Sequence, residues 1–353
     1  MKKIITIENK KIGFNQRAFT IAEIGSNHNR DKKTVFKLID ACAEAGFDCV
    51  KFQIYDPEEA FSKKETTKDV KLDHLYGLKP WWIVARDKIL MPREWFEEMF
   101  EYIRKKKMIP LSAIHRVEDC EFLMKFGLPA IKLASIDLNY FQLQKKLLKF
   151  KLPIIFSTGM GTEKEIIQSV NFFKKNKKSD IALLHCNSYY PPKNNMVNLN
   201  NIKHFEKKFK MIVGYSDHTE DNYTAFASVV LGAKIIEKHI TLDKKYKGAD
   251  HPFAIEPKEM KDFIYGIRKI EETLGSEKRK LSKEEFRNRL MIRRSIVAKK
   301  DITKGSVIKE SDIKYARPGT GIPITKSKTV INKIAKKNIK SETIISQLMV
   351  RKK

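Results

Sequence analysis

Residues 211–239 read MIVGYSDHTEDNYTAFASVVLGAKIIEKH and carry the pattern from which the fold can be predicted. Two short apolar runs, at 211–215 and 234–239, stand on either side of a longer segment. Side chains capable of chemistry close each run: Ser216, Asp217 and His218 follow the first, and His239 ends the second. Short β-branched runs of this kind are typical of parallel strands that are buried on both faces.

The same pattern recurs along the chain. Further runs lie at 19–24, 49–52, 109–114, 130–134, 154–157 and 181–186, which brings the total to eight. The segments between them include 34–45, 94–105 and 164–174, whose apolar residues are spaced three or four apart as on one face of a helix. Eight strand–helix units in about 275 residues predict an α/β fold, a (β/α)8 TIM barrel.

A polar side chain stands at or just past the end of nearly every run. These residues are Glu23, Lys51, Gln53, Ser112, Lys132, Ser135, Ser157, His185, Ser216, His218 and His239. Ordinary strand ends would be dominated by turn-forming Gly, Asn and Pro instead. Because the carboxyl ends of barrel strands converge on one mouth, we expect these side chains to meet there and to form an active site.

The periodicity changes after Leu274. A charged stretch, GSEKRKLSKEEFRNRLMIRRS, is followed by short strand-like pieces broken by turns, SIVAKKDITKGSVI, IKYARPGTGI and a segment ending in TIISQLMV. We predict a barrel domain at residues 1–275, a linker at 276–292 and a small β-rich domain at 293–353. A domain of about 60 residues has a thin core and usually docks against something larger.

The chain has 353 residues and a formal net charge of +28. Such a charge suits nucleic acid, an anionic membrane or anionic small substrates. The basic residues are 57 Lys and only 14 Arg, spread along the whole length, whereas nucleic-acid-binding proteins favour Arg and gather it in one patch. No run approaches the roughly 18 apolar residues that a membrane span needs. We therefore predict neither a nucleic-acid nor a membrane partner, and a Lys-rich solvated surface with anion binding at particular residues.

The cysteines, Cys42, Cys49, Cys120 and Cys186, include no CxxC pair. Their pattern argues against a disulfide framework and a structural zinc site, and predicts reduced, mostly buried thiols. The N-terminal segment MKKIITIENKKIG lacks the apolar region of a signal peptide. The expected location is the cytoplasm.

His218 and His239 follow consecutive strands, so they can meet although they are distant in sequence. Two neutral imidazoles at a barrel mouth suit a divalent ion with open coordination positions, such as Mn or Zn. A structural pair or an acid/base pair stays an alternative, because a His–His pair alone more often has one of these roles. The sequence contains neither an HExxH motif nor a carboxylate cluster.

Lys51 and Lys132 are predicted on inward-facing strand ends, near the hydroxyl groups of Ser135, Ser157 and Ser216. Two ammonium groups with several hydroxyls suit a compact dianion such as a phosphate ester. A pairing of one lysine with Glu23 or Glu237, or a Schiff-base lysine, stays an alternative. Glu23 itself could orient a hydroxyl or move a proton, or could act only as a salt-bridge partner.

The longest gap between strands runs from about residue 54 to 93 and contains LYGLKPWWIVARDKILMPREWF. Trp81, Trp82 and Trp95 could form a lid over the mouth, or could belong to a helix and its packing.

Taken together, these motifs resemble the sialic acid synthase family. The matching pieces, in order, are IAEIGSNHN, VKFQ, IKLAS, STGM, LLHCNSYYP, VGYSDHT, IIEKHITLD, GADH, RRSIVAKKDI and RPGTGI, and they lie between residues 20 and 322. Any one alone is weak, but their joint occurrence is specific. The resemblance implies a TIM barrel followed by a small antifreeze-like (SAF) domain, which is exchanged across a homodimer and caps the barrel of the partner.

The family condenses phosphoenolpyruvate with an N-acetylated aldose, with a divalent ion, preferably Mn with Mg or Co possible, that polarises the aldehyde. The resemblance implies that phosphoenolpyruvate is bound by residues Glu23, Lys51, Lys132, Ser135, Ser157 and Ser216. It places the ion on His218 and His239. It places the sugar near Gln53, Asn187, Tyr190 and Asp250, with Arg317 arriving from the other subunit. Glu23 would position the reacting carbon or a water, and Asp250 the aldehyde end.

The chain departs from the family pattern on the sugar side. LSAIHR, with His115 and Arg116, replaces Ser-x-Pro-Phe. ASID places Asp137 where the family has Glu, and Asp137 is predicted to bind substrate. GADH replaces GPDH and is followed by Pro252 and Phe253. N-acetylmannosamine is the expected acceptor, and a 2,4-diacetamido-6-deoxy sugar, giving a legionaminic or pseudaminic acid, is a rival. A metal-dependent aldolase or hydrolase on the same barrel stays an alternative.

Overall fold

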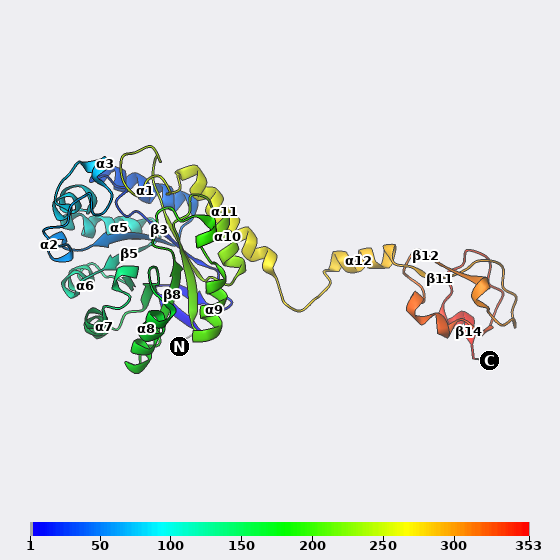
Figure 1. Ribbon diagram of the computed structural model, residues 1–353. Coiled ribbons are helices and arrows are strands. Elements are labelled where there is room, and N and C mark those ends of the chain that lie inside the picture. The colour runs from blue at the N-terminus through cyan, green and yellow to red at the C-terminus, as the bar shows by residue number, and fades with distance from the viewer. Residues whose placement is uncertain (1–2, 353) are drawn as a thin grey trace. The chain divides into compact units, whose positions relative to one another are not determined.

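The computed structural model describes residues 3–352 and divides into two compact units at Gly275–Ser276 (Figure 1). The first unit is a closed barrel of eight parallel strands, in which the last strand pairs with the first. The strands are β3 (Phe19–Glu23), β4 (Cys49–Ile54), β5 (Ile109–Ile114), β6 (Ile131–Leu133), β7 (Ile154–Ser157), β8 (Ile181–Cys186), β9 (Ile212–Asp217) and β10 (Ile235–His239). All eight predicted runs form these strands, and the TIM-barrel prediction is confirmed.

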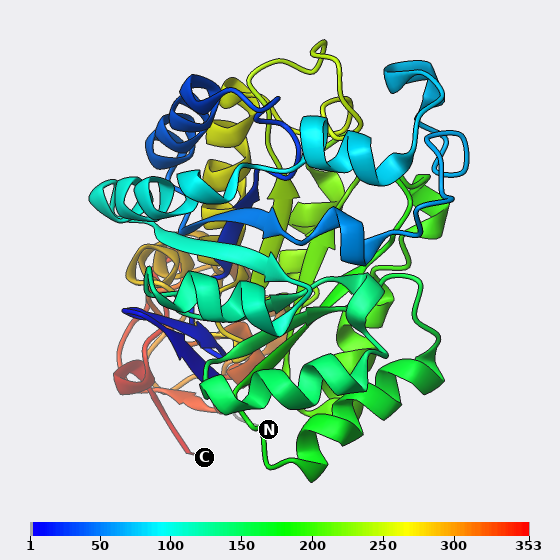
Figure 2. The ribbon, with the colours of Figure 1, turned by 90° about the vertical axis from the view of Figure 1, so that its left-hand side faces the viewer.

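A helix follows each barrel strand, and Figure 2 shows these helices surrounding the strands. They are α1 (Lys32–Ala45), α5 (Phe96–Lys105), α6 (Val117–Met124), α7 (Phe141–Leu147), α8 (Glu163–Lys175), α9 (Asn200–Phe209), α10 (Tyr223–Val230) and α11 (Pro257–Leu274). Helix α1 shows how the sequence specifies them. Asp31 accepts hydrogen bonds from the first backbone N–H groups, and Gly46 ends the helix at φ 90°, where a residue without Cβ is favoured.

A hairpin of β1 (Ile4–Ile7) and β2 (Lys10–Gly13) precedes the barrel, and the sequence analysis did not predict it. Its apolar side chains Ile5, Ile7 and Ile12 join the barrel core. The Lys10 ammonium lies 2.7 Å from Asp48, directly before β4. The hairpin therefore lies at the end where the strands begin, away from the mouth.

The insertion after β4 holds the short helices α2 (Pro57–Ala60), α3 (Asp73–Tyr76) and α4 (Trp81–Val84). Trp81 packs in an apolar cluster with Tyr55 and Phe61. Trp82 lies under the cations of Lys63 and Arg86, and Trp95 packs against the barrel core. All three tryptophans thus pack against other side chains, as one of the two predicted alternatives had it. The cluster around Trp81 supplies part of the pocket wall described below.

The second unit contains helix α12 (Lys283–Ile292) and two antiparallel pairs of strands, β11 (Ser295–Ala298) with β12 (Ile313–Ala316) and β13 (Ile334–Ala335) with β14 (Val350–Arg351). Its core is small, with Ile296, Ile308, Val330 and Ile345 at its centre. The stretch predicted as a linker, 276–292, contains α12, none of whose side chains is buried. A regular element there was not expected.

No helix among residues 3–352 combines the length and the apolar character needed to cross a bilayer. The four cysteines are free and buried, as predicted.

Candidate active site

A cavity of about 640 Å³ opens where the carboxyl ends of the barrel strands meet. Eleven of the predicted site residues line it: Glu23, Lys51, Gln53, Lys132, Ser135, Asp137, Ser157, Tyr190, Ser216, His218 and His239. Their convergence follows from the barrel, which brings residues that are up to 216 positions apart to one mouth.

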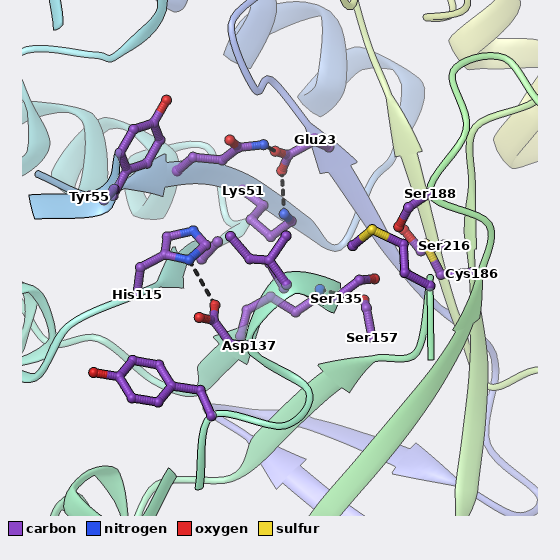
Figure 3. Close-up of a pocket in the computed structure, with 18 of the residues that line it drawn as sticks. Glu23, Lys51, Tyr55, His115, Ser135, Asp137, Ser157, Cys186, Ser188 and Ser216 are labelled. Atoms are coloured by element: carbon purple, nitrogen blue, oxygen red, sulfur yellow. Dashed lines mark hydrogen bonds and ion pairs between the residues drawn. The ribbon is translucent and has the colours of Figure 1, made fainter. Parts of the chain in front are cut away.

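Two buried lysines and two buried glutamates form the floor of the cavity. Glu23 and Lys51 are register partners on β3 and β4, and the Lys51 ammonium lies 2.7 Å from a Glu23 carboxylate oxygen. The same ammonium lies 3.7 Å from Glu237, which is also 3.8 Å from the ammonium of Lys132. Figure 3 shows the Lys51 ammonium pointing at the Glu23 carboxylate beside it. The lysine–glutamate pair that was predicted as an alternative is therefore present, and both of its members line the cavity.

Hydroxyl and amide groups complete this floor. The Lys132 ammonium donates to Ser157 Oγ at 2.7 Å, and Ser216 Oγ donates to Glu237 Oε1 at 2.8 Å. Gln53 Nε2 donates to Glu23 Oε1 at 2.7 Å. Each charged group thus has a partner from a neighbouring strand, and the floor is fixed before any ligand binds.

The floor shifts the pKa values of its members. Burial raises the pKa of Glu237, but the Lys132 and Lys51 ammonium groups outweigh it and lower that pKa to about 2. Burial dominates at Glu23, whose pKa lies above its ordinary value although Lys51 opposes the shift. Burial likewise lowers the pKa of Lys132. Glu237 is the fixed negative charge here, and Glu23 is the carboxyl group that holds a proton more readily.

The two predicted metal-ligating histidines lie together, with ring centroids 5.3 Å apart. His218 Nδ1 lies 2.8 Å from the backbone carbonyl oxygen of Asn187, so this nitrogen is the donor and Nε2 keeps its lone pair. His239 Nδ1 is buried and has no hydrogen-bond partner in the described part of the chain, and burial lowers the pKa of this ring to about 3. Burial also acts to lower the pKa of His218, but the neighbouring Cys186 outweighs it, and that pKa lies above its ordinary value. With Nε2 of His218 and Nδ1 of His239 unprotonated, the two rings fit a divalent ion.

The protein supplies few further ligands for such an ion. Within residues 3–352, no group of three or more His, Cys, Asp or Glu side chains is arranged to hold a metal. Asp250 approaches His239 Nδ1 only to 3.9 Å, and it accepts hydrogen bonds from the backbone N–H and the hydroxyl of Ser26. A Cβ at Gly25 would lie 2.8 Å from Asp250, so this loop needs glycine to approach so closely.

Five of the residues expected at the mouth do not line the cavity. Ser112 Oγ donates to the backbone carbonyl group of Ala113, and His185 Nε2 lies 2.6 Å from the carbonyl oxygen of Val197, because the neighbouring residues Ala113 and Cys186 face the cavity instead. Asn187 holds His218 through its carbonyl group, while its side-chain amide donates to the carbonyl oxygen of Met196. Asp250 lies outside the cavity lining, with a carboxylate oxygen 3.9 Å from His239 Nδ1. Arg317 belongs to the second unit, where its side chain is exposed and makes no hydrogen bond or ion pair with residues 3–352. Tyr190 does line the cavity, with its ring centroid 4.3 Å from that of His218.

Sequence reasoning missed several lining residues. Glu237 was considered only as a lysine partner, although it stands two residues before His239 and must face the same side of β10. Cys186 also lines the cavity. Burial raises the pKa of its thiol, but His218 and Lys132 outweigh burial, so that the pKa lies below its ordinary value. Tyr55 carried no signal, because it lies past its strand in an insertion whose path the sequence does not specify.

The chain is similar to known proteins over most of its length. Residues 38–279 match the NeuB family model, and residues 293–351 match the SAF domain. The chain is 35% identical to N,N'-diacetyllegionaminic acid synthase of Campylobacter jejuni over 94% of its length and 100% of the relative. It is 32% identical to pseudaminic acid synthase of the same species, over 94% of this chain and 96% of the relative.

Solved structures agree with these matches. The structure of N-acetylneuraminic acid (sialic acid) synthetase from Leptospira borgpetersenii superposes with a TM-score of 0.72 at 31% identity, covering 82% of this chain and 95% of that one. The resemblance seen in the motifs is thereby confirmed. The chain is an enzyme that belongs to the NeuB family and carries a C-terminal SAF domain.

Proposed function

We propose that this enzyme condenses phosphoenolpyruvate with the open-chain form of an acetamido aldose, producing a nonulosonic acid and inorganic phosphate. The observation that carries the proposal is the buried floor of the cavity, where Lys51 and Lys132 stand among serine hydroxyls below His218 and His239. The names of the relatives, which are synthases of legionaminic and pseudaminic acid, support the same class of product.

The anionic substrate would bind at the lysines. Lys51 and Lys132 act as point charges toward its phosphate and carboxylate groups, and the hydroxyls of Ser135, Ser157 and Ser216 donate hydrogen bonds. Ser135 Oγ already accepts a hydrogen bond from the Gly159 N–H at 3.0 Å. A Cβ at Gly159 would lie 2.8 Å from that hydroxyl, so the backbone reaches the site only because residue 159 is glycine.

His218 and His239 would hold a divalent ion, Mn by preference with Mg or Co as alternatives. When bound, such an ion supplies Lewis-acid polarisation of the aldehyde oxygen. The chain itself contributes the fixed orientation of both rings, His218 through the Asn187 carbonyl group and His239 through its burial.

The remaining groups would orient the reaction. The enol carbon of phosphoenolpyruvate forms the new bond to the aldehyde carbon, water adds at the resulting cationic C2, and phosphate leaves with cleavage of its C–O bond. Glu23, with its raised pKa and its hydrogen bond from Gln53, would position the water or hold its proton. Asp250, held by Ser26, would orient the aldehyde end.

Two acceptors remain candidates. N-acetylmannosamine is the first, in line with the sialic acid synthetase structure from Leptospira borgpetersenii. A 2,4-diacetamido-6-deoxy sugar is the second, and the legionaminic and pseudaminic acid synthases among the relatives favour it. Apolar groups on the cavity wall, among them Phe61, Ile136 and Met160, offer a surface to an extra methyl group.

Phosphate release tests the proposal. The full-length enzyme is incubated with phosphoenolpyruvate, Mn²⁺ and a panel of acetamido sugars that includes both candidates, with a chelator in a parallel series. We expect phosphate release that needs both substrates and stops with the chelator. Absence of release with every sugar would overturn the proposed function, and release that the chelator does not alter would overturn the metal assignment alone.

A further inference from the structure

A histidine–carboxylate pair on the cavity wall takes no part in the function proposed above. His115 Nδ1 lies 2.7 Å from Asp137 Oδ2, and Figure 3 shows the two side chains facing each other beside Tyr55. Both residues line the cavity, and their side chains are 13% and 8% exposed.

The pair stands nearer the mouth than the floor. Ala113 on β5 and Lys132 on β6 are register partners, and Lys132 belongs to the floor. His115 is two residues beyond Ala113, and Asp137 is five beyond Lys132. The pair therefore borders the part of the cavity above the lysines, where an uncharged second substrate would lie.

Neighbouring groups hold both members in place. The buried Gln144 side chain donates to the backbone carbonyl groups of Asp137 and Leu138, at 2.9 and 2.8 Å. The Tyr55 ring meets the His115 ring edge-on, with centroids 5.7 Å apart. A pair fixed in this way is already organised before substrate binds, and it can act as a general base on a proton within hydrogen-bonding reach.

The hydrogen bond also defines the chemistry of the imidazole. A carboxylate accepts, so His115 Nδ1 carries the proton and Nε2 of the neutral ring is left as a base. Asp137 stabilises the imidazolium that forms when Nε2 takes up a proton. A histidine arranged in this way can remove a proton from a hydroxyl group and return it to another oxygen.

Opening of a cyclic sugar is a reaction that such a base can catalyse. An acetamido aldose in water is almost entirely a cyclic hemiacetal, whereas the condensation consumes the open-chain aldehyde. We propose that His115 and Asp137 open the ring of the bound sugar, an inference that rests on the proposed function.

In this step His115 Nε2 takes the proton of the anomeric hydroxyl group. The C1–O1 bond becomes a carbonyl as the C1–O5 bond breaks, and O5 takes a proton from water. The resulting hydroxide removes the proton from the imidazolium, so atoms and charges balance and no other reactant is consumed. His115 is then a catalytic residue, and Asp137 acts through it.

Two acceptors separate ring opening from other roles. One is the natural cyclic sugar that supports phosphate release. The other is an acetamido aldehyde that cannot close a ring, because hydrogen replaces its hydroxyl groups at C4, C5 and C6. In His115→Gln and Asp137→Asn, kcat/KM for the cyclic sugar should fall about 100-fold or more, the usual contribution of a general base. For the acyclic aldehyde both variants should stay within about twofold of the unaltered enzyme.

His204→Gln is the matched control. His204 also contacts a carboxylate, with Nε2 2.9 Å from Glu163, but on the protein surface outside the cavity. This variant should use both acceptors as the unaltered enzyme does.

A second measurement follows ring opening directly. With phosphoenolpyruvate present and the divalent ion removed, exchange between the two anomers of the sugar is measured by NMR. The unaltered enzyme should accelerate the exchange, and the His115 and Asp137 variants should not. Equal losses with both acceptors, or no loss with the cyclic sugar, would overturn the inference. An unaltered enzyme that releases no phosphate would instead overturn the proposed function.

Discussion

At the scale of single residues, the proposed function depends most on the two buried lysines. Lys51 balances Glu23 and Glu237, so burial of its ammonium is offset and its pKa is raised. Among residues 3–352, Lys132 has only Ser157 and the backbone within hydrogen-bonding distance, and Glu237 lies 3.8 Å away. Lys132 is therefore the cation with more to gain from an incoming anion.

Lys51→Met and Lys132→Met should each weaken the use of phosphoenolpyruvate more than the use of sugar. Loss of one hydrogen bond to a charged group costs about 1.5–3 kcal/mol, or roughly 10- to 100-fold in affinity. Calorimetric titration with phosphoenolpyruvate measures the effect, with the larger loss expected for Lys132→Met. Equal affinity in both variants and the unaltered enzyme would make the lysines structural only.

His28 gives the barrel a stability that depends on pH. Burial, with a further contribution from Arg30, lowers the pKa of this ring from 6.5 to about 4. Between these values the unfolded chain binds a proton that the folded chain does not, so the free energy of unfolding falls as the pH drops from 6.5 to 4. One pKa unit corresponds to about 1.4 kcal/mol, which makes the loss a few kcal/mol.

His28→Asn should make this pH dependence smaller, whatever it does to stability at pH 7. Urea unfolding at pH 7 and pH 4.5, with chelator present, gives the difference for each protein. The exposed His74, replaced by Asn, is the control and should leave the difference unchanged. An unchanged difference in His28→Asn would show that the ring is protonated in the folded state.

At the scale of elements, strand β10 places functional side chains on both faces of the barrel wall. Glu237 and His239 face the cavity, and the alternation of the strand turns Lys238 to the opposite side. There the fully buried ammonium lies 2.8 Å from the Asp217 carboxylate, and it donates to the carbonyl oxygens of Thr219 and Asp221 at 2.5 and 2.8 Å. Lys238 thus holds the loop that carries His218.

Lys238→Met should lower stability and loosen His218 together. A buried Asp217 left without its partner costs about 3–5 kcal/mol, which urea unfolding would detect. Binding of Mn²⁺, measured by calorimetry, should weaken in the same variant. Lys178→Met removes a comparable lysine, 2.8 Å from Asp180 and outside the cavity, and should leave Mn²⁺ binding unchanged. Unchanged Mn²⁺ binding in Lys238→Met would show that the contacts of Lys238 with the His218 loop do not affect the ion site.

At the scale of the whole molecule, the question is what the second unit contributes. Its core is small, and Arg317 projects from the turn RPGTGI as an exposed side chain without a partner among residues 3–352. We propose, as the family resemblance implies, that the enzyme is a homodimer in which this arginine reaches the sugar in the other chain.

Mixed dimers test this arrangement. Arg317→Ala and His239→Ala, each inactive alone, should recover up to about a quarter of full activity when refolded together. Random pairing makes half of the dimers mixed, and each mixed dimer has one intact site of two. Subunit exchange is checked with differently tagged chains. Exchange without recovery would mean that Arg317 acts in its own chain or has no role.

The sequence alone determined the barrel, because its signals are local. Each strand is a short apolar run, each helix has its own spacing and caps, and the polar residue at a strand end is adjacent in sequence to the strand that positions it. The convergence of Lys51, Lys132, His218 and His239 followed from the regular geometry of the barrel. Motifs in both units also identified the family.

Only the tertiary structure decided which side chains meet in pairs. The contacts between Glu237 and the lysines and between Lys238 and Asp217 join different strands, and the contact between His115 and Asp137 joins the segments that follow two strands. Register and strand twist set these distances. The β1–β2 hairpin and the wall around Trp81 depend likewise on a barrel surface that must exist before they can pack against it. Such contacts leave no periodic trace in the sequence, because the free energy that stabilises them comes from burial and charge shared between distant residues.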